Sequence, residues 1–336
     1  MRITILFGGT NKERLVSVAT AQALHAALPE ADLWFWDADD TVHETRSETL
    51  VKHSRPFEDP FKAGTPGPGM PSLGRIEAAL DRAQGEGRLL VLGLHGGSAE
   101  NGELQAMCEV RNVPFTGSDS ASSHLAFDKT AAKRFAAIAG VTSPQAITLE
   151  EIDAALTDHG RLIAKPERDG SSYGLIFVNS KQDIVAVRNA AKSEEYLIEP
   201  FIEGVEATCG VLEQSDGTVL SLPPIEIVPA DGGFGFDYVA KYLSKSTQEI
   251  CPGRFSPEIS GQIMDLALRA HRALSCAGYS RTDFIVSDKG PIYLETNTLP
   301  GLTRASLYPK ALKAQGIDFA DFLRDQIVIA ERRARR

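Results

Sequence analysis

The stretch RTDFIV (Arg281–Val286), followed by SDKG (Ser287–Gly290) and IYLETN (Ile292–Asn297), decides the fold of this chain. Two short runs rich in β-branched and aromatic residues around a turn of this kind predict an antiparallel β-hairpin. The second run continues directly into TLPGLT (Thr298–Thr303), an apolar turn with proline and glycine.

Four polar side chains of this hairpin are predicted to lie on matching faces. Because side chains alternate along a strand, Arg281 and Asp283 share one face of the first strand, and Glu295 and Asn297 share one face of the second. If the two faces coincide, three oxygen ligands converge beside an arginine. Such a set suits Mg²⁺ that carries phosphate oxygens. The alternative is an edge hairpin whose charges are solvated, and we favour the metal site.

Composition restricts the class of protein. The chain has 336 residues, enough for two or three domains, and its net charge of −10 argues against nucleic acid as the main partner. Its four cysteines are widely spaced, which is typical of buried thiols in a reducing compartment. No apolar run approaches the roughly 18 residues that a membrane span needs. We therefore expect a cytoplasmic protein with no membrane partner.

The N-terminus predicts the first unit of an open, Rossmann-like α/β domain. An apolar strand over residues 2–7 ends in Gly8-Gly9-Thr10, and a helix pattern starts near Val16. Residues 37–72 are polar and rich in proline and glycine, so we expect an irregular surface insertion there.

A second unit begins near Ser122 and contains a candidate phosphate lid. The strand Arg161–Pro166 carries Lys165 near its end, and the small-residue loop Glu167–Gly174 joins it to the strand Leu175–Val178. Backbone N–H groups and serine hydroxyls of such a loop can bind anionic oxygens, with the lysine supplying charge. A simple Gly/Ser hairpin turn is the alternative.

In this order, these motifs resemble the D-alanine–D-alanine ligase family of the ATP-grasp superfamily from end to end. The matching pieces are Phe7–Thr10 with Glu13, Arg14, Val16 and Ser17; His95 and Gly96 with Glu100–Gly102 and Gln105; Phe115–Ser118; Asp128, Lys129 and Lys133; Lys165 and Pro166 with Gly170–Ser172 and Gly174; Glu199 and Glu206; Phe236–Tyr238 with Lys241 and Tyr242; Arg281–Phe284; and Glu295–Thr303 with Ser306 and Leu307. The resemblance implies an ATP-grasp fold of class α/β, with α+β character in the lid, preceded by the Rossmann-like domain. We expect an N-terminal domain over residues 1–121, a central lid subdomain over 122–200 and a C-terminal subdomain over 201–336.

The resemblance also implies a nucleotide and metal site. Lys129 and Lys165 would hold ATP phosphates with Ser172, while Glu199 and Glu206 would contact adenine and ribose. Asp283, Glu295 and Asn297 would bind Mg²⁺ or Mn²⁺, as two ions, in agreement with the hairpin argument.

Further residues would serve catalysis and the amino-acid substrates by the same resemblance. Arg281 would stabilise the acyl phosphate and the tetrahedral intermediate, and Gly301 would offer a backbone N–H. Lys241 would lie over the transferred phosphate, with Tyr242 and Ser171 closing the site. The substrate-binding residues would be His95 for the first amino acid, and Ser306 and the Leu307 backbone for the second.

The implied activity is ATP-dependent joining of two amino acids, D-alanine and D-alanine, for peptidoglycan precursors, in a homodimer. Tyr242 is associated with dipeptide products. One position departs from the family pattern Glu-Arg-Glu-Val-Ser, because Leu15 stands in place of the second glutamate. In the family that glutamate helps to bind the ammonium group of the first substrate, and a leucine cannot make this contact. Two alternatives follow, namely a related ligase with a different first substrate and a nucleotide-binding protein without turnover.

Overall fold

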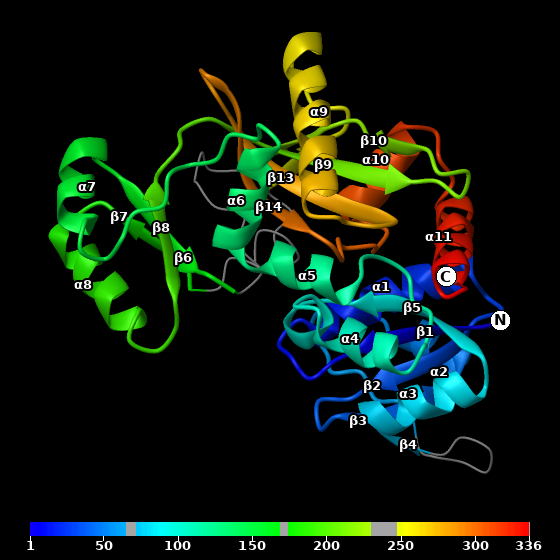
Figure 1. Ribbon diagram of the computed structural model, residues 1–336. Coiled ribbons are helices and arrows are strands. Elements are labelled where there is room, and N and C mark those ends of the chain that lie inside the picture. The colour runs from blue at the N-terminus through cyan, green and yellow to red at the C-terminus, as the bar shows by residue number, and fades with distance from the viewer. Residues whose placement is uncertain (65–71, 169–173, 230–246, 336) are drawn as a thin grey trace.

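The structure is a computed structural model that describes residues 1–64, 72–168, 174–229 and 247–335. The described residues form three β-sheets with helices packed on them (Figure 1). The strand orders are β4-β3-β2-β1-β5, then β7-β6-β8, then β12-β11-β9-β13-β14 with β10 paired to β9. This mixed α/β arrangement agrees with the predicted fold class.

The N-terminal sheet has a parallel centre. Strands β1 (Arg2–Gly8), β2 (Asp32–Trp36) and β5 (Arg88–Leu94) run parallel, with β1 between the other two. All seven residues of β5 are buried, as expected for a parallel strand covered on both faces. Helices α1 (Arg14–Ala27), α3 (Ile76–Gly85) and α4 (Glu103–Val110) accompany this sheet. The loops after β1 and β5 therefore meet at one sheet edge, the usual place for a ligand.

The region 37–72 is less irregular than the sequence predicted. It contains strand β3 (Thr41–Thr45) and helix α2 (Ser47–Lys52), and strand β4 (Ser72–Arg75) begins at its end. Val42, Leu50 and Phe61 are buried in the core. The proline and glycine residues that suggested a loop lie from Pro56 onward. Only Val42 is apolar within residues 41–45, so the sequence carries no alternation there, and strand β3 is defined by its pairing with β2. Residues 65–71 are outside the described part.

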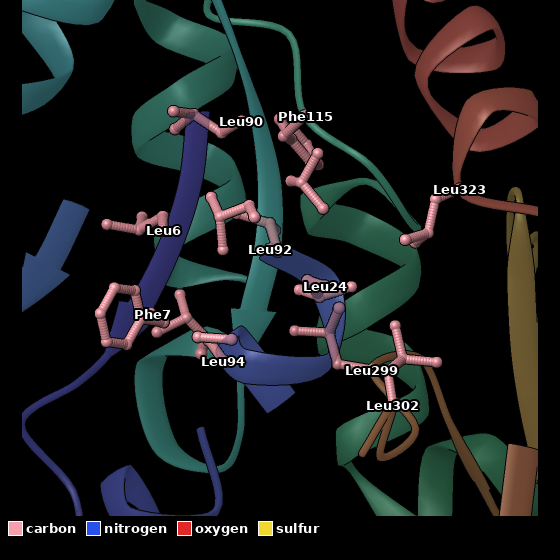
Figure 2. Packing of buried hydrophobic residues seen from close by; sticks show 14 of the residues in the cluster. Leu6, Phe7, Leu24, Leu90, Leu92, Leu94, Phe115, Leu299, Leu302 and Leu323 are labelled. Atoms are coloured by element: carbon pink, nitrogen blue, oxygen red, sulfur yellow. The ribbon is translucent and has the colours of Figure 1, made fainter. Parts of the chain in front are cut away.

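The main hydrophobic core joins the two ends of the chain. Leu299 and Leu302, which follow the C-terminal hairpin, pack beside Leu24 of α1 and near Leu92 and Leu94 of β5 (Figure 2). This packing fixes the turn after the hairpin against the ligand-facing edge of the N-terminal sheet.

The small sheet of β7 (Ile176–Val178), β6 (Leu162–Pro166) and β8 (Tyr196–Pro200) has its own core with helices α7 (Ile152–His159) and α8 (Lys181–Ala190). Residues 120–138 form two helices, α5 (Ser120–Phe127) and α6 (Lys129–Ile138). Asp128 separates them because its carboxylate accepts the Ala131 N–H at 2.9 Å, which starts a new helix. This cap sets the position of Lys129 at the first turn of α6.

The C-terminal sheet carries the hairpin. It consists of β9 (Val205–Glu213), β10 (Val219–Ser221), β11 (Ile225–Val228), β12 (Gln248–Ile250), β13 (Tyr279–Ser287) and β14 (Gly290–Asn297). Helix α9 (Pro257–Ala273) lies across β9, β13 and β14, and α10 (Leu307–Ala314) and α11 (Phe319–Arg333) end the chain. No helix among the described residues is long and apolar enough to cross a membrane.

Candidate active site

Strands β13 and β14 bring the four polar residues of the hairpin together. In their antiparallel register Arg281 is opposite Asn297, and Asp283 is opposite Glu295. The intervening pair, Thr282 and Thr296, is buried, and its hydroxyl groups are 3.0 Å apart. The four polar side chains therefore share the other face, as alternation along each strand requires.

Asp283 is the centre of this group. Arg281 donates to it through Nε (2.9 Å to Oδ1) and Nη2 (2.8 Å to Oδ2). Asn297 Nδ2 lies 3.2 Å from Oδ2, and the Thr208 hydroxyl of β9 lies 2.5 Å from Oδ1. A carboxylate that accepts hydrogen bonds from a guanidinium, an amide and a hydroxyl is fixed in position and orientation.

Two cavities adjoin this face. The larger, of about 130 Å³, is lined by Arg281, Asn297 and Gly301 together with residues of the N-terminal unit. The smaller, of about 30 Å³, is lined by Lys129, Glu295 and Asn297 among others. Glu100 and Asn297 line both cavities, so the two lie on either side of these side chains.

His95 reaches the larger cavity from the end of β5. Its Nε2 lies 2.7 Å from the Thr20 hydroxyl on α1, and the residue is only 5% exposed. Burial and the nearby Arg281 charge lower the pKa of His95 to about 4. The imidazole is therefore neutral near pH 7 and acts as a hydrogen-bonding group there rather than as a cation.

Two glutamates line the larger cavity beside His95. Glu13 precedes α1, and a Cβ on Gly96 would lie 2.2 Å from its Oε2, so the glycine leaves room for this carboxylate. Burial of the carboxyl group and the Glu13 charge raise the pKa of Glu100 to about 8. Carboxyl groups gathered at one wall of a cavity form an environment that favours a cationic ligand group.

The opposite side of the larger cavity is the start of α10. Ser306 is the residue before this helix, and its Oγ accepts the Thr303 N–H at 3.1 Å and lies 2.7 Å from the Thr303 hydroxyl. Gly301, Ser306 and Leu307 all line the cavity. Unpaired N–H groups at a helix N-terminus bind carboxylates well.

Lysines gather around Glu199 on the side of the smaller cavity. Lys165 of β6 lies 3.0 Å from Glu199 Oε2, and Lys133 of α6 pairs with Oε1. Lys129 is 7% exposed and lines the smaller cavity. Glu206 lies separately, on β9 opposite Ile285 of β13. This side of the site carries an excess of buried positive charge suited to phosphate groups.

Comparison with known proteins identifies the family. The family model described as D-ala D-ala ligase N-terminus matches residues 2–118, and the one described as D-ala D-ala ligase C-terminus matches residues 144–329. The chain belongs to the D-alanine–D-alanine ligase family. The D-alanine–D-alanine ligase of Desulforudis audaxviator is 35% identical over 344 residues, which cover 99% of both chains. That of Nitratidesulfovibrio vulgaris strain DP4 is 34% identical over 325 residues, or 95% of this chain and 94% of the relative.

Solved structures agree with this family assignment. VanG D-Ala:D-Ser ligase from Enterococcus faecalis has a TM-score of 0.77 at 27% identity, over 98% of this chain and 99% of its own. D-alanine–D-alanine ligase from Bacillus anthracis complexed with ATP has a TM-score of 0.70 at 26% identity, over 100% and 98%. This family has the ATP-grasp fold, so the chain is an ATP-grasp protein.

Glu13 and Leu15, which are close in sequence, differ in their position relative to the cavities. Leu15 lies on α1 and is not among the residues that line either cavity, whereas Glu13 lines the larger one. Residues two apart on a helix point in nearly opposite directions, so a carboxylate at position 15 would not replace one at 13. Leu15 as a substrate-binding position stays a prediction, and the lining of the larger cavity favours Glu13 for the contact with the first substrate.

Three residues were not named as site residues from the sequence although their motifs were noticed: Glu13, Glu100 and Lys133. Lys133 follows Lys129 by four positions and so shares its helix face, which was an available signal. Four predicted residues, Ser171, Ser172, Lys241 and Tyr242, lie outside the described residues.

The hairpin residues fit a divalent cation by their chemistry. Asp283, Glu295 and Asn297 supply carboxylate and amide oxygens, which Mg²⁺ prefers. Among the described residues no cluster of three or more His, Cys, Asp or Glu side chains could hold a metal ion by itself. A metal at this hairpin would therefore use the amide oxygen of Asn297 and oxygens of its substrate as well.

Proposed function

We propose that this chain is an ADP-forming D-alanine–D-alanine ligase that makes a precursor of peptidoglycan. The observation that carries the proposal is the pair of cavities that share Glu100 and Asn297. The smaller is lined by Lys129 and Glu295, which suit phosphate and a metal ion. The larger is lined by Glu13, Arg281 and Ser306, which suit the ammonium and carboxylate groups of amino acids. Curated relatives with this activity in their names match at 34% identity over 95% of the chain, which favours D-alanine over another first substrate.

The nucleotide occupies the lysine side in this proposal. Lys129 and Lys165 bind the phosphates, and Glu206 contacts adenine or ribose, as the family resemblance implies. The resemblance gave Glu199 the same role, but its buried carboxylate is held by Lys133 and Lys165, so we assign it to these lysines instead. Asp283, Glu295 and Asn297 would hold two Mg²⁺ or Mn²⁺ ions, which would neutralise the charge of the phosphate oxygens. Ser171, Ser172, Lys241 and Tyr242 belong to the closing loops in the same proposal.

The first D-alanine lies in the larger cavity. Its ammonium meets Glu13 and its carboxylate lies near Arg281 and the neutral His95. A carboxylate oxygen attacks the γ-phosphorus of ATP, the bond to the bridging oxygen breaks, and ADP leaves with that electron pair. Arg281 stabilises the charge that develops, because its guanidinium faces the reacting group.

The second D-alanine places its carboxylate at the start of α10, on Ser306 and the Leu307 N–H. Its neutral amine attacks the carbonyl carbon of the acyl phosphate, with the Gly301 N–H directed at the oxyanion. The C–O bond to phosphate then breaks, the nitrogen loses a proton, and an amide and inorganic phosphate result. Exclusion of water is required because water would hydrolyse the acyl phosphate.

The test is ADP release from purified protein with ATP, Mg²⁺ and D-alanine, together with mass spectrometry of the product. We expect release that depends on D-alanine, produces the dipeptide, and stops when EDTA removes the metal. L-Alanine is the matched control. Release with D-serine or another amino acid in place of D-alanine would favour the alternative ligase, and nucleotide binding without release would favour a binding protein.

We further propose a cytoplasmic homodimer without nucleic-acid or membrane partners. The family resemblance supports the dimer, and the net charge of −10 supports the absence of nucleic acid. Light scattering after size-exclusion chromatography would give the mass directly, and a mass of one chain at micromolar concentration would contradict the dimer.

A further inference from the structure

Lys133, Glu199 and Lys165 form a buried network that connects two parts of the fold. Glu199 lies on β8 with a side chain that is 1% exposed, and Lys165 lies on the neighbouring strand β6 at 13%. Lys133 comes from α6 and is 7% exposed. Helix α6 packs against α9 and β14 of the C-terminal part, so Lys133 reaches the small sheet from outside it.

The two lysines differ in what the proposed reaction demands of them. Lys165 is proposed to bind ATP phosphate, and its Nζ lies 3.0 Å from Glu199 Oε2. A phosphate group would compete with Glu199 for this ammonium. Glu199 is too buried to exchange the lost partner for water, and a buried carboxylate without a counter-ion is strongly unfavourable.

We propose that Lys133 is a positioning residue, the lasting counter-ion of Glu199, which allows Lys165 to leave Glu199 and bind nucleotide phosphate. This inference rests on the proposed nucleotide site and adds a residue to which no role had been given. Glu199 pairs with both lysines in this structure, and in the proposed ATP complex it keeps Lys133 alone of the pair.

The electrostatics of the network agree with this division. Burial and the Lys165 charge lower the pKa of Lys133 to about 8, although Glu199 opposes the shift. For Glu199 burial raises the pKa, but the two lysines outweigh it and lower the pKa overall. Lys133 is thus a cation whose charge is tolerated because Glu199 is there, and its Nζ is held by that carboxylate.

The experiment compares Lys133→Met, Glu199→Gln and the double variant in the ADP-release assay, each with ATP and D-alanine varied separately. We expect Lys133→Met to raise the KM for ATP about tenfold or more, with the KM for D-alanine changed less than about threefold. Adding Lys133→Met to Glu199→Gln should change the KM for ATP less than about threefold, because the carboxylate that Lys133 neutralises is already absent in that background. Lys133→Arg, which keeps the charge, should retain most of the wild-type ATP affinity.

Arg254→Met is the matched control. Arg254 pairs with Glu226, whose side chain is 9% exposed, at 2.6 Å and outside both cavities. Loss of this pair should leave the KM for ATP unchanged, which separates the proposed role from a general effect of losing an ion pair.

Three outcomes would overturn the inference. Equal effects of Lys133→Met in the wild-type and Glu199→Gln backgrounds would mean that Lys133 acts on the nucleotide itself. Equal increases in both KM values would mean a general structural role. If Lys133→Met does not fold, the double variant decides, since it should fold once the buried Glu199 carboxylate is replaced by an amide, and its failure to fold contradicts the proposal.

The proposed function is judged separately in the same assay. Wild-type protein without D-alanine-dependent ADP release would reject the ligase activity. The counter-ion role would still be measurable by calorimetry with a non-hydrolysable ATP analogue on the same variants. It would be rejected only if Lys133→Met weakened binding of the analogue equally in the wild-type and Glu199→Gln backgrounds.

Discussion

Arg281 donates two hydrogen bonds to Asp283, the residue two positions further along strand β13. A proposed metal ligand and the cation proposed to stabilise the transferred phosphate thus form an ion pair with each other. In the proposed reaction, Asp283 would also bind the metal and Arg281 would also bind the phosphate. The relationship predicts that metal dependence and phosphate transfer are coupled through one carboxylate.

Asp283→Asn tests this coupling. We expect the Mg²⁺ concentration for half-maximal rate to rise about tenfold and kcat to fall about 100-fold or more, because an amide keeps the shape but loses the charge. Mg²⁺ titration of ADP release measures both. Asp288→Asn, at the exposed turn of the same hairpin, is the control and should behave as wild type. An unchanged Mg²⁺ requirement in Asp283→Asn would exclude this residue as a ligand.

Positions 13 and 15 give opposite predictions. Glu13→Gln should raise the KM for D-alanine about tenfold, because the charge beside the first ammonium is lost from the cavity wall. Leu15→Glu should leave that KM unchanged, since Leu15 does not line the cavity. Steady-state rates against D-alanine concentration measure both variants. A lower KM in Leu15→Glu would restore the interpretation made from the sequence alone.

Glu100 predicts a stability that depends on pH. Burial and Glu13 raise its pKa to about 8, whereas in the unfolded chain a glutamate titrates near about 4.3. The folded state therefore binds the proton more tightly, and this contribution to stability is present below about pH 4 and lost as pH rises toward 8. Glu100→Gln does not ionise, so its gain in Tm over wild type should be larger at pH 9 than at pH 5.

Thermal melts at pH 5, 7 and 9 without ligands measure this difference. Glu103→Gln, an exposed neighbour at the start of α4, is the control and should give a constant difference. A gain in Tm from Glu100→Gln that does not vary with pH would contradict the raised pKa.

Two glycine-to-alanine changes should act in opposite directions on stability. A Cβ on Gly204 would lie 2.4 Å from the Val286 carbonyl oxygen, so Gly204→Ala should cost about 1–3 kcal/mol and disturb Glu206 at the start of β9. Gly261 lies within helix α9 with nothing near its Cβ position, so Gly261→Ala should add about 0.5–1 kcal/mol. Urea denaturation measures both, and a stabilised Gly204→Ala would contradict the contact.

The hairpin was predictable because its information is local. Alternation along two strands is enough to place Asp283 and Glu295 on one face, and the observed register agrees. The break between α5 and α6 is also local, because the carboxylate of the cap residue Asp128 accepts the Ala131 N–H and starts the second helix. Helix α9 ends at Ala273, and Ser275 takes a left-handed conformation just beyond it.

Features that depend on distant parts of the chain could not be predicted in the same way. A sequence shows that Glu100 is a carboxylate but not that Glu13 and Arg281 lie close enough to shift its pKa. Likewise, the choice between Glu13 and Leu15 depends on which way α1 leaves its glycine turn. The family resemblance supplied roles, whereas burial and the direction of each side chain came only from packing.

Glu100 and Asn297 stand between the two cavities and belong to both walls. In the proposed reaction, an intermediate made at one wall would be consumed at the other without diffusing through solvent. The same arrangement matters for inhibition, since one compound with an amino-acid head and a phosphorylated tail could occupy both spaces at once. A mutation of Glu100 or Asn297 that conferred resistance to such a compound would also change a side chain that lines the sites of both proposed half-reactions.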